Sequence, residues 1–284
     1  MAEFDGRVAV VTGAASGIGR GLAERCAAEG MATLLADVDE EGLETTRAAL
    51  EQQGARAAVQ LTDVCDLSQV ERLAERAWTE FGRVDLVFNN AGVLVSGPTW
   101  QHSAETWKWV LGVNLFGAIH GVQAFVPRLI AQGTPSRIVN TASVGGLLAG
   151  PLLAPYTVSK FGVVGLSESL YYEFEMMKLP VRVSVLCPGA VVTGIADSER
   201  LRPDWAAIAG GDAQDPEFQA AIRTGIQAGM EPKELAEFVF TAIAEDRFWI
   251  LPDPGFLEGI ARRTQSIVEG VNPTYGAELS PDED

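Results

Sequence analysis

Histidine and cysteine are scarce in this chain of 284 residues, which has two histidines and three cysteines. Cys26, Cys65 and Cys187 are scattered without the spacing of metal ligands, and three cysteines cannot all pair with one another. Each lies in or beside an apolar segment, which is typical of a buried structural thiol. His102 and His120 are too isolated to form a zinc site. We therefore expect no metal centre and no role for either histidine in catalysis.

Basic residues and long apolar runs are also few. The chain has 21 Lys and Arg against 38 Asp and Glu, a formal net charge of −17. Such a surface repels nucleic acids and anionic membranes, so neither is expected as a partner. No apolar stretch approaches the roughly 20 residues that a membrane-spanning helix needs. Residues 1–5 are acidic and lack the pattern of a signal peptide. These features predict a cytoplasmic protein that acts on a small molecule.

Strand-like and helical patterns alternate along the chain. Apolar, β-branched runs predict strands over residues 8–11, 33–36, 57–61, 86–88, 137–140, 182–186 and 248–251. Helical spacing predicts helices over 19–29, 40–53, 67–81, 105–131, 156–177 and 232–245. This alternation predicts an α/β fold, a doubly wound, mostly parallel seven-stranded sheet of the Rossmann-like type.

No repeat or low-complexity linker divides the sequence, so residues 1–284 are expected to form one domain. Two segments interrupt the alternation. Residues 190–230 form a long connection, predicted to be a substrate loop because long connections in compact domains are often binding loops. Residues 253–284 form a C-terminal extension, with a helix predicted over 256–269 and a disordered acidic tail that ends at 280–284.

A glycine run directly follows the first predicted strand and opens the first predicted helix. Its glycines are Gly13, Gly17 and Gly19, and Ser16 and Ile18 lie among them. Glycine allows a tight turn and lets a diphosphate approach the backbone N–H groups, which the helix N-terminus then supplements. The alternative is an ordinary structural turn. The strand-turn-helix context favours dinucleotide binding.

Asp37 at the end of the second predicted strand bears on the choice of cofactor. It lies eighteen residues after Gly19, near the offset at which a carboxylate meets the adenosine ribose. A carboxylate there accepts hydrogen bonds from the ribose hydroxyls and repels a 2′-phosphate, so NAD is predicted over NADP. The alternative is that Asp37 only caps the helix that begins near residue 40.

Two further loops follow strands on the same side of the predicted sheet. Asp63 and Val64 follow the third strand, where adenine contacts are expected. Asn90, Ala91 and Gly92 follow the fourth, where the backbone can turn toward the cofactor. Asx and glycine residues also occur in ordinary loops.

Tyr156 and Lys160 are four residues apart at the start of a predicted helix and share one face. An ammonium beside a phenol favours the phenolate and lowers the pKa of the tyrosine, which can then exchange a proton with an alcohol or ketone. The alternative is a surface pair. Ser143 follows a central strand and can hydrogen-bond the reacting oxygen. Asn114 is a polar residue in an apolar helix, either satisfied by the backbone or holding a water that links Lys160 to solvent.

Together these motifs resemble the short-chain dehydrogenase/reductase family, in its NAD-preferring branch. The matching residues occur in the family's order over 7–193: Thr12-Gly13-x3-Gly17-x-Gly19, Asn89-Asn90-Ala91-Gly92, Asn114, Ser143, Tyr156-x3-Lys160 and Pro188-Gly189-x-Val191-x-Thr193. The resemblance implies a catalytic tetrad of Asn114, Ser143, Tyr156 and Lys160.

The resemblance also implies further roles in cofactor binding. Lys160 would bind the nicotinamide ribose, and Val191 and Thr193, in the motif that begins with Pro188 and Gly189, would contact the carboxamide. The implied reaction is hydride transfer between NAD(H) and an alcohol or ketone, with Tyr156 as general acid/base.

The substrate side is expected to be apolar, because Leu94, Val95, Leu147, Leu148, Leu152 and Leu153 surround it with few charged residues. This favours a neutral, hydrophobic secondary alcohol or ketone, although each leucine could instead pack its loop on the core. Short stretches within 200–203, 229–232 and 250–254 are similar to family members that oxidise benzylic alcohols of aromatic dimers. Trp205 and Phe218 could close over such a ring or pack on a neighbouring subunit.

Two alternatives stay open at this point. One is a different enzyme on the same fold, such as a dehydratase or an NADPH-preferring carbonyl reductase, and the other is a non-catalytic protein that binds NAD as a sensor or scaffold. The resemblance also implies a homodimer or homotetramer formed through the helices predicted over 105–131 and 156–177. Both helices are apolar over more of their surface than one buried face requires.

Overall fold

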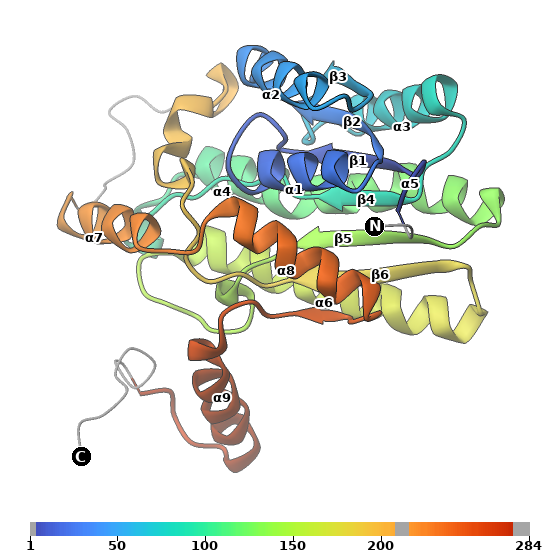
Figure 1. Cartoon of the computed structure of the whole chain (residues 1–284). Coiled ribbons are helices and arrows are strands. Elements are labelled where there is room, and N and C mark those ends of the chain that lie inside the picture. The colour runs from blue at the N-terminus through green and yellow to red at the C-terminus, as the bar shows by residue number, and fades with distance from the viewer. Residues whose placement is uncertain (1–3, 208–215, 275–284) are drawn as a thin grey trace.

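The computed structural model describes residues 4–207 and 216–274. Within these ranges the chain forms one seven-stranded sheet with the strand order β3-β2-β1-β4-β5-β6-β7, and every paired strand is parallel to its neighbour (Figure 1). The strands are β1 (Val8–Thr12), β2 (Ala32–Asp37), β3 (Ala57–Leu61), β4 (Leu86–Asn89), β5 (Ser136–Thr141), β6 (Val181–Leu186) and β7 (Trp249–Ile250). The predicted doubly wound, Rossmann-like fold is confirmed.

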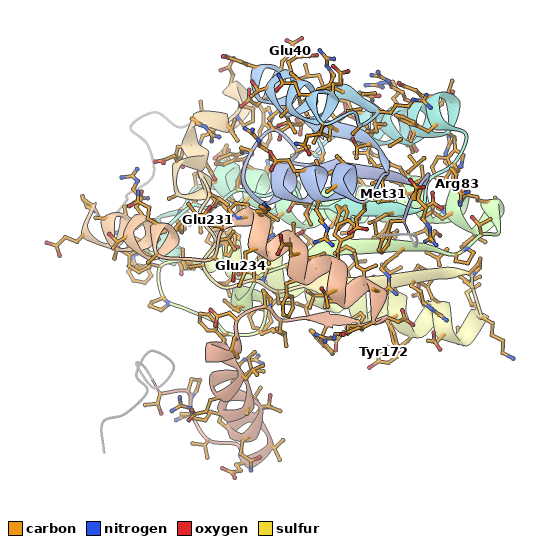
Figure 2. The ribbon with its side chains drawn as sticks, viewed as in Figure 1. Met31, Glu40, Arg83, Tyr172, Glu231 and Glu234 are labelled. Atoms are coloured by element: carbon orange, nitrogen blue, oxygen red, sulfur yellow. The ribbon has the colours of Figure 1, made fainter. Side chains whose placement is uncertain are left out.

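Helices cover both faces of the sheet, because the central strands are buried on both sides. One face packs against α1 (Gly17–Ala28), α2 (Glu40–Gln52) and α8 (Pro232–Ala244). The other packs against α3 (Leu67–Phe81), α5 (Gly117–Gln132) and α6 (Ala154–Met177). Alternate residues of β1 divide between the two cores: Ala9 and Val11 face the first, and Val10 faces the second. Charged and aromatic side chains such as Glu40 and Tyr172 point outward (Figure 2).

The long helix predicted over 105–131 is three segments in the structure. These are α4 (Ala104–Leu111), a π-helical turn η2 (Gly112–Phe116) and α5. Single π turns within α-helices often mark functional sites, and this one carries Asn114. By length and composition alone, Ala104–Gln132 is apolar enough to cross a membrane, contrary to the expectation from the sequence. In the structure 44% of its most apolar window is buried, and α5 contributes to the core beneath the sheet.

The connection after β6 is largely helical where it is described, rather than a plain loop. It contains the short helices η4 (Ile195–Leu201) and η5 (Asp204–Ala206), and then α7 (Pro216–Gln227). The C-terminal extension contains η6 (Pro254–Phe256) and α9 (Leu257–Glu269), close to the predicted helix, and α9 projects from the body of the molecule (Figure 1). The acidic tail at 280–284 lies outside the described residues.

Candidate active site

A cavity of about 540 Å³ opens at the carboxyl ends of the strands, where parallel α/β sheets bind their ligands. The loops that follow β1 to β6 all contribute to its wall, and η4 and α7 close it from the side. Its volume falls in the range of small-molecule binding sites.

The glycine turn between β1 and α1 forms the floor of this cavity. Gly13 and Gly17 have φ angles of 69° and 52°, which other residues adopt at a cost. A Cβ on residue 19 would lie 1.9 Å from the carbonyl oxygen of Gly13. The Ser16 side chain does not cap α1, so the N-terminal N–H groups of the helix remain available to an anion. Ser16 and Ile18 line the cavity with the three glycines.

Asp37 lines the cavity at the end of β2 and does not cap a helix. The N-cap of α2 is Asp39, whose carboxylate accepts from Gly42 N–H at 3.0 Å. The Asp37 carboxylate instead accepts from the backbone N–H groups of Ala15, at 3.0 Å, and Val38, at 2.7 Å. Burial raises the pKa of Asp37, and these hydrogen bonds partly offset the effect. The carboxylate thus ties the end of β2 to the glycine turn.

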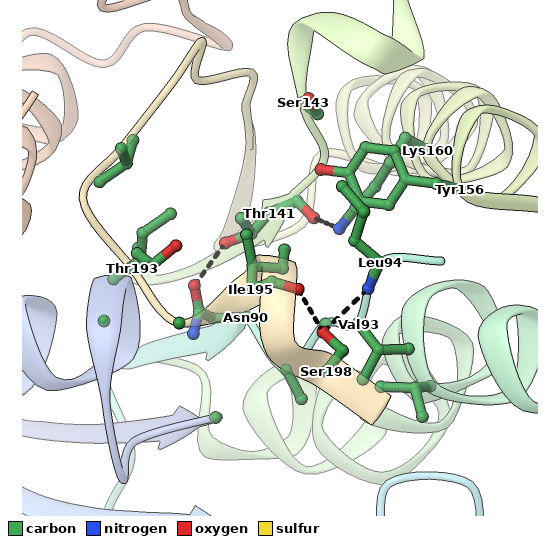
Figure 3. Close-up of a pocket in the computed structure, with 18 of the residues that line it drawn as sticks. Asn90, Val93, Leu94, Thr141, Ser143, Tyr156, Lys160, Thr193, Ile195 and Ser198 are labelled. Atoms are coloured by element: carbon green, nitrogen blue, oxygen red, sulfur yellow. Dashed lines mark hydrogen bonds between the residues drawn. The ribbon is translucent and has the colours of Figure 1, made fainter. Parts of the chain in front are cut away.

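The remaining residues predicted to bind the cofactor all line the same cavity. They are Asp63 and Val64 after β3, Asn90, Ala91 and Gly92 after β4, and Pro188, Gly189, Val191 and Thr193 after β6. The Thr12 hydroxyl accepts from Asn90 N–H at 2.9 Å, and the Asn90 Oδ1 accepts from the Thr141 hydroxyl at 3.2 Å (Figure 3). These contacts join the carboxyl ends of β1, β4 and β5.

Ser143, Tyr156 and Lys160 lie together on the cavity wall (Figure 3). The Lys160 Nζ lies 5.6 Å from the centre of the Tyr156 ring and donates to the Thr141 carbonyl at 2.8 Å. The alternative of a surface pair is therefore wrong. Ser143 follows β5, and its hydroxyl accepts from Gly145 N–H at 3.0 Å, which fixes the serine at the start of the short helix η3 (Val144–Gly146).

The pKa values of Tyr156 and Lys160 differ from the expectation that the lysine lowers the pKa of the tyrosine. Burial raises the pKa of Tyr156, and a hydrogen bond with Ser143 partly offsets this. The same burial lowers the pKa of Lys160 to about 8. The Lys160 ammonium donates its hydrogen bond to the Thr141 carbonyl rather than to the phenol. Because the Tyr156 side chain is partly exposed to the cavity, water there weakens the effect of burial.

Asn114 lies behind the cavity wall and does not line it. Its Oδ1 accepts from Val93 N–H at 2.8 Å, and its Nδ2 donates to the Val93 carbonyl and to the Ser159 hydroxyl. The side chain is therefore satisfied within the protein, as the alternative interpretation held. It remains close to the lysine, because a Cβ on Gly92 would lie 3.6 Å from both Asn114 Oδ1 and Lys160 Nζ.

Comparison with known proteins agrees with this geometry. Residues 7–204 match the family model for short chain dehydrogenases. The chain belongs to the short-chain dehydrogenase family. A crystal structure of a family member from Burkholderia phymatum in complex with NAD is similar to it with a TM-score of 0.94 and 43% identity. That similarity covers 98% of this chain and 100% of the other.

Two curated relatives are similar over nearly the whole length. The C alpha-dehydrogenase of Sphingobium sp. is 34% identical over 274 residues, which are 96% of this chain and 89% of that protein. The CLA biosynthesis dehydrogenase/reductase of Lactiplantibacillus plantarum is 33% identical over 276 residues, which are 94% of this chain and 95% of that protein. The chain is therefore an oxidoreductase of this family.

The predicted apolar surroundings of the substrate are confirmed only in part. Leu94, Leu148 and Leu153 line the cavity. Val95 is buried in a small core with Trp109, and Leu147 packs against the core beside β6. Among the described residues, neither Trp205 nor Phe218 is part of the lining.

Several lining residues were not predicted from the sequence. They are apolar, apart from one arginine: Trp109, Val113, Arg200, Leu201, Pro203, Ile222, Ile226 and Phe256. The apolar residues of α7 share one side of that helix, at the spacing of residues 222 and 226, so a helical pattern in 216–227 was the signal that could have found them. Phe256 is in the C-terminal extension, and nothing in its local pattern places it beside Gly189 at the cavity.

Proposed function

We propose that this chain is an NAD-dependent alcohol dehydrogenase and ketone reductase of the short-chain family. The single observation that carries the proposal is the joint placement of Ser143, Tyr156 and Lys160 on the wall of a cavity whose floor is the glycine turn. The glycine cradle, the uncapped start of α1 and the Asp37 carboxylate fit a dinucleotide without a 2′-phosphate. The cofactor is NAD, as in the similar Burkholderia phymatum structure.

When bound, the nicotinamide supplies or accepts the hydride. Tyr156 is the group that moves the proton of the substrate hydroxyl, and Ser143 hydrogen-bonds and orients the substrate oxygen beside it. Lys160 holds a cationic group next to the phenol. Because its pKa is lowered to about 8, Lys160 exchanges protons more readily near neutral pH than an ordinary lysine. Asn114 positions the loop after β4 by bonding both backbone groups of Val93.

The substrate is proposed to be a neutral, hydrophobic secondary alcohol or ketone, with aryl compounds as the first candidates. Leu94, Leu148 and Leu153 form one apolar side of the cavity, and Ile222, Ile226 and Phe256 add another. The described residues of 195–230 and 253–274 thus add to the substrate wall, while the glycine turn, the loops after the strands and the start of α6 supply the cofactor site and the proton-moving residues.

The assignment of Tyr156 is tested by Tyr156→Phe, which removes only the hydroxyl. Turnover of a panel of aryl and aliphatic secondary alcohols, followed as NADH absorbance at 340 nm, should fall at least a thousandfold, within the range of general acid/base contributions. NADH binding should stay nearly intact. Tyr172→Phe, at a tyrosine that is 67% exposed, is the matched control and should turn over like the wild type. Retained activity in Tyr156→Phe would refute the assignment.

The cofactor preference is tested by titrating NADH and NADPH against the wild type and Asp37→Ala. The wild type should bind NADH at least tenfold more tightly than NADPH, because the half-buried Asp37 carboxylate repels a 2′-phosphate. Asp37→Ala should bring the Kd values of NADH and NADPH closer together. Tighter binding of NADPH by the wild type would overturn the role given to Asp37 and favour the NADPH-preferring alternative.

A homodimer or homotetramer is proposed from the surface of the long helices. Phe116, Val158 and Met176 are 49%, 48% and 77% exposed on the segments η2 and α6, and these apolar side chains are available to contact another subunit. Light scattering coupled to size exclusion should give a mass of two or four chains. A single-chain mass at micromolar concentration would contradict it.

A further inference from the structure

The cavity contains a cationic side chain that is not one of the residues predicted to bind the cofactor or to move protons. Among the described residues that line it, the cationic side chains are Lys160, beside Tyr156, and Arg200, on η4. Arg200 is exposed, so its guanidinium can move and make new contacts. Lys160 is buried at 2% exposure and already bonded to Thr141.

Arg200 differs from the other arginines described in the connection after β6. Arg202 pairs with Glu199, and Arg223 pairs with Asp197. In the described part of the chain, Arg200 makes no ion pair, and its guanidinium donates only one long hydrogen bond, 3.5 Å, to the Asp197 carbonyl. A guanidinium has five donors in a planar fork, so most of the hydrogen-bonding capacity of Arg200 is available to a ligand.

The position of Arg200 places it beside the glycine turn. A Cβ on Gly17 would lie 2.8 Å from Thr193 Cγ2, so Thr193 rests against the turn. The next residue, Gly194, lies against Arg200: a Cβ there would be 3.8 Å from Nη2. The chain therefore runs from the glycine turn through Thr193 and Gly194 to the guanidinium.

The negative charges around the cavity make a positively charged side chain favourable at the position of Arg200. Asp37, Asp39 and Asp63 line it, and the whole chain carries a formal net charge of −17. A diphosphate bound at the glycine turn brings two more negative charges into this surrounding. Near the turn, Arg20 on α1 is paired with Glu24 and is not part of the lining. The partial positive charge of the α1 N-terminus is otherwise the local source of attraction.

We propose that Arg200 is a cofactor-binding residue whose guanidinium pairs with the diphosphate of NAD, closing η4 over the glycine turn. The proposal rests on the proposed use of NAD. Arginine is suited to this because its planar fork can bond two phosphate oxygens at once. Arg200 thereby links the helical connection after β6, which also lines the substrate side through Leu201, to the presence of the dinucleotide.

The experiment compares the binding of NADH, ADP and adenosine to the wild type, Arg200→Gln and Arg200→Lys by isothermal titration calorimetry. Adenosine serves as the probe that lacks phosphates. Arg200→Gln should raise the Kd of NADH and of ADP about tenfold, the loss of one charge-assisted hydrogen-bonded pair, and leave the Kd of adenosine unchanged. The Kd values of Arg200→Lys should lie between those of the wild type and those of Arg200→Gln, because lysine keeps the positive charge but lacks the planar pair of donors. Arg223→Gln removes the same charge from the same connection without touching the lining and should bind like the wild type.

Salt gives a second readout. Raising the NaCl concentration should weaken NADH binding to the wild type more than to Arg200→Gln, since an exposed ion pair is screened. Melting temperatures without ligand should be equal for all variants, which separates binding from folding.

Each of the following results would overturn the proposal. Equal losses for NADH and adenosine would mean that Arg200 only supports the packing of η4. An unchanged Kd for NADH and ADP would exclude a diphosphate contact. If NADH binding were unchanged but the KM of carboxylate-bearing substrates rose, Arg200 would face the substrate instead. If the wild type bound neither NADH nor ADP, the proposed function would fall together with this inference, whereas tight and equal NADH binding by wild type and Arg200→Gln would reject the inference alone.

Discussion

Gly19 offers a direct test of how the glycine turn works, through the substitution Gly19→Ala. The added Cβ would lie 1.9 Å from the Gly13 carbonyl oxygen and 2.7 Å from Asn90 Nδ2. The first of these neighbours is backbone, and it belongs to a glycine with a positive φ, so it cannot rotate away as a flexible side chain would. Ordinary contact requires 3.4 Å or more. Either the turn or the start of α1 must therefore shift by more than 1 Å.

The size of the effect follows from that overlap. Overpacking in a well-packed interior costs about 1–3 kcal/mol, and in a domain of this size each kcal/mol lowers the melting temperature by about 2–4 °C. Gly19→Ala should therefore melt about 2–12 °C below the wild type. The same shift moves the N–H groups that are proposed to bind the diphosphate, so the Kd of NADH should rise at least tenfold.

The assay is differential scanning fluorimetry with and without NADH, followed by calorimetric titration. Gly225→Ala is the matched control, because Gly225 lies in α7 with nothing within 4 Å of an added Cβ. Replacing a helical glycine of this kind stabilises by about 0.5–1 kcal/mol. The reasoning about the turn is wrong if Gly19→Ala melts within 1 °C of the wild type and binds NADH equally well.

Since burial lowers the pKa of Lys160 from 10.5 to about 8, the unfolded chain binds more protons than the folded one between these pH values. Wild-type stability should therefore rise with pH from about 8 to 10. Lys160→Met should be more stable than the wild type at pH 7 by up to about 3 kcal/mol. Urea unfolding should show this difference shrinking between about pH 8 and 10. A difference that stays constant with pH would mean that burial of the Lys160 ammonium is not its cause. Asn114→Ala leaves both backbone groups of Val93 unpaired, so the free energy of unfolding should fall by about 2–3 kcal/mol, and a fall below 0.5 kcal/mol would speak against it. Phe256→Ala should raise the KM of bulky aryl substrates severalfold while the Kd of NADH stays constant; a rise for both would place Phe256 against the cofactor.

The fold was predictable because its strands are short, buried on both sides and separated by helices with clear apolar faces. The boundaries of β3 and α3 agree with the structure, and those of the other strands differ by one or two residues. The exception in the first half is the π turn that interrupts the helix predicted over 105–131. Apolar spacing alone does not register a change from four-residue to five-residue hydrogen bonding.

The residues of the candidate site also divide into those that the sequence predicted and those that it did not. The glycines, Asp37 and Ser143 lie at or just after strand ends, and Tyr156 and Lys160 lie at the start of the helix that follows β5, so their placement followed from the topology. The substrate side was harder, because its residues come from segments whose position depends on long-range packing. Trp205 was a candidate for its ring, but it is 53% exposed and lies outside the lining. The pKa of Tyr156 also could not be read from the spacing to Lys160, since burial depends on the whole fold.

The C-terminal extension has a consequence for how this enzyme could change over time or be redesigned. Phe256 lies in van der Waals reach of Gly189, since a Cβ there would meet its ring at 2.8 Å, and α9 follows it directly. The walls proposed to select the alcohol are thus encoded after residue 193 as well as in two short loops, while the dinucleotide floor is encoded mostly before it. Exchanging residues 201–230 and 253–274 between relatives, with Arg200 kept in place, should therefore transfer substrate choice and leave the redox half of the molecule in working order.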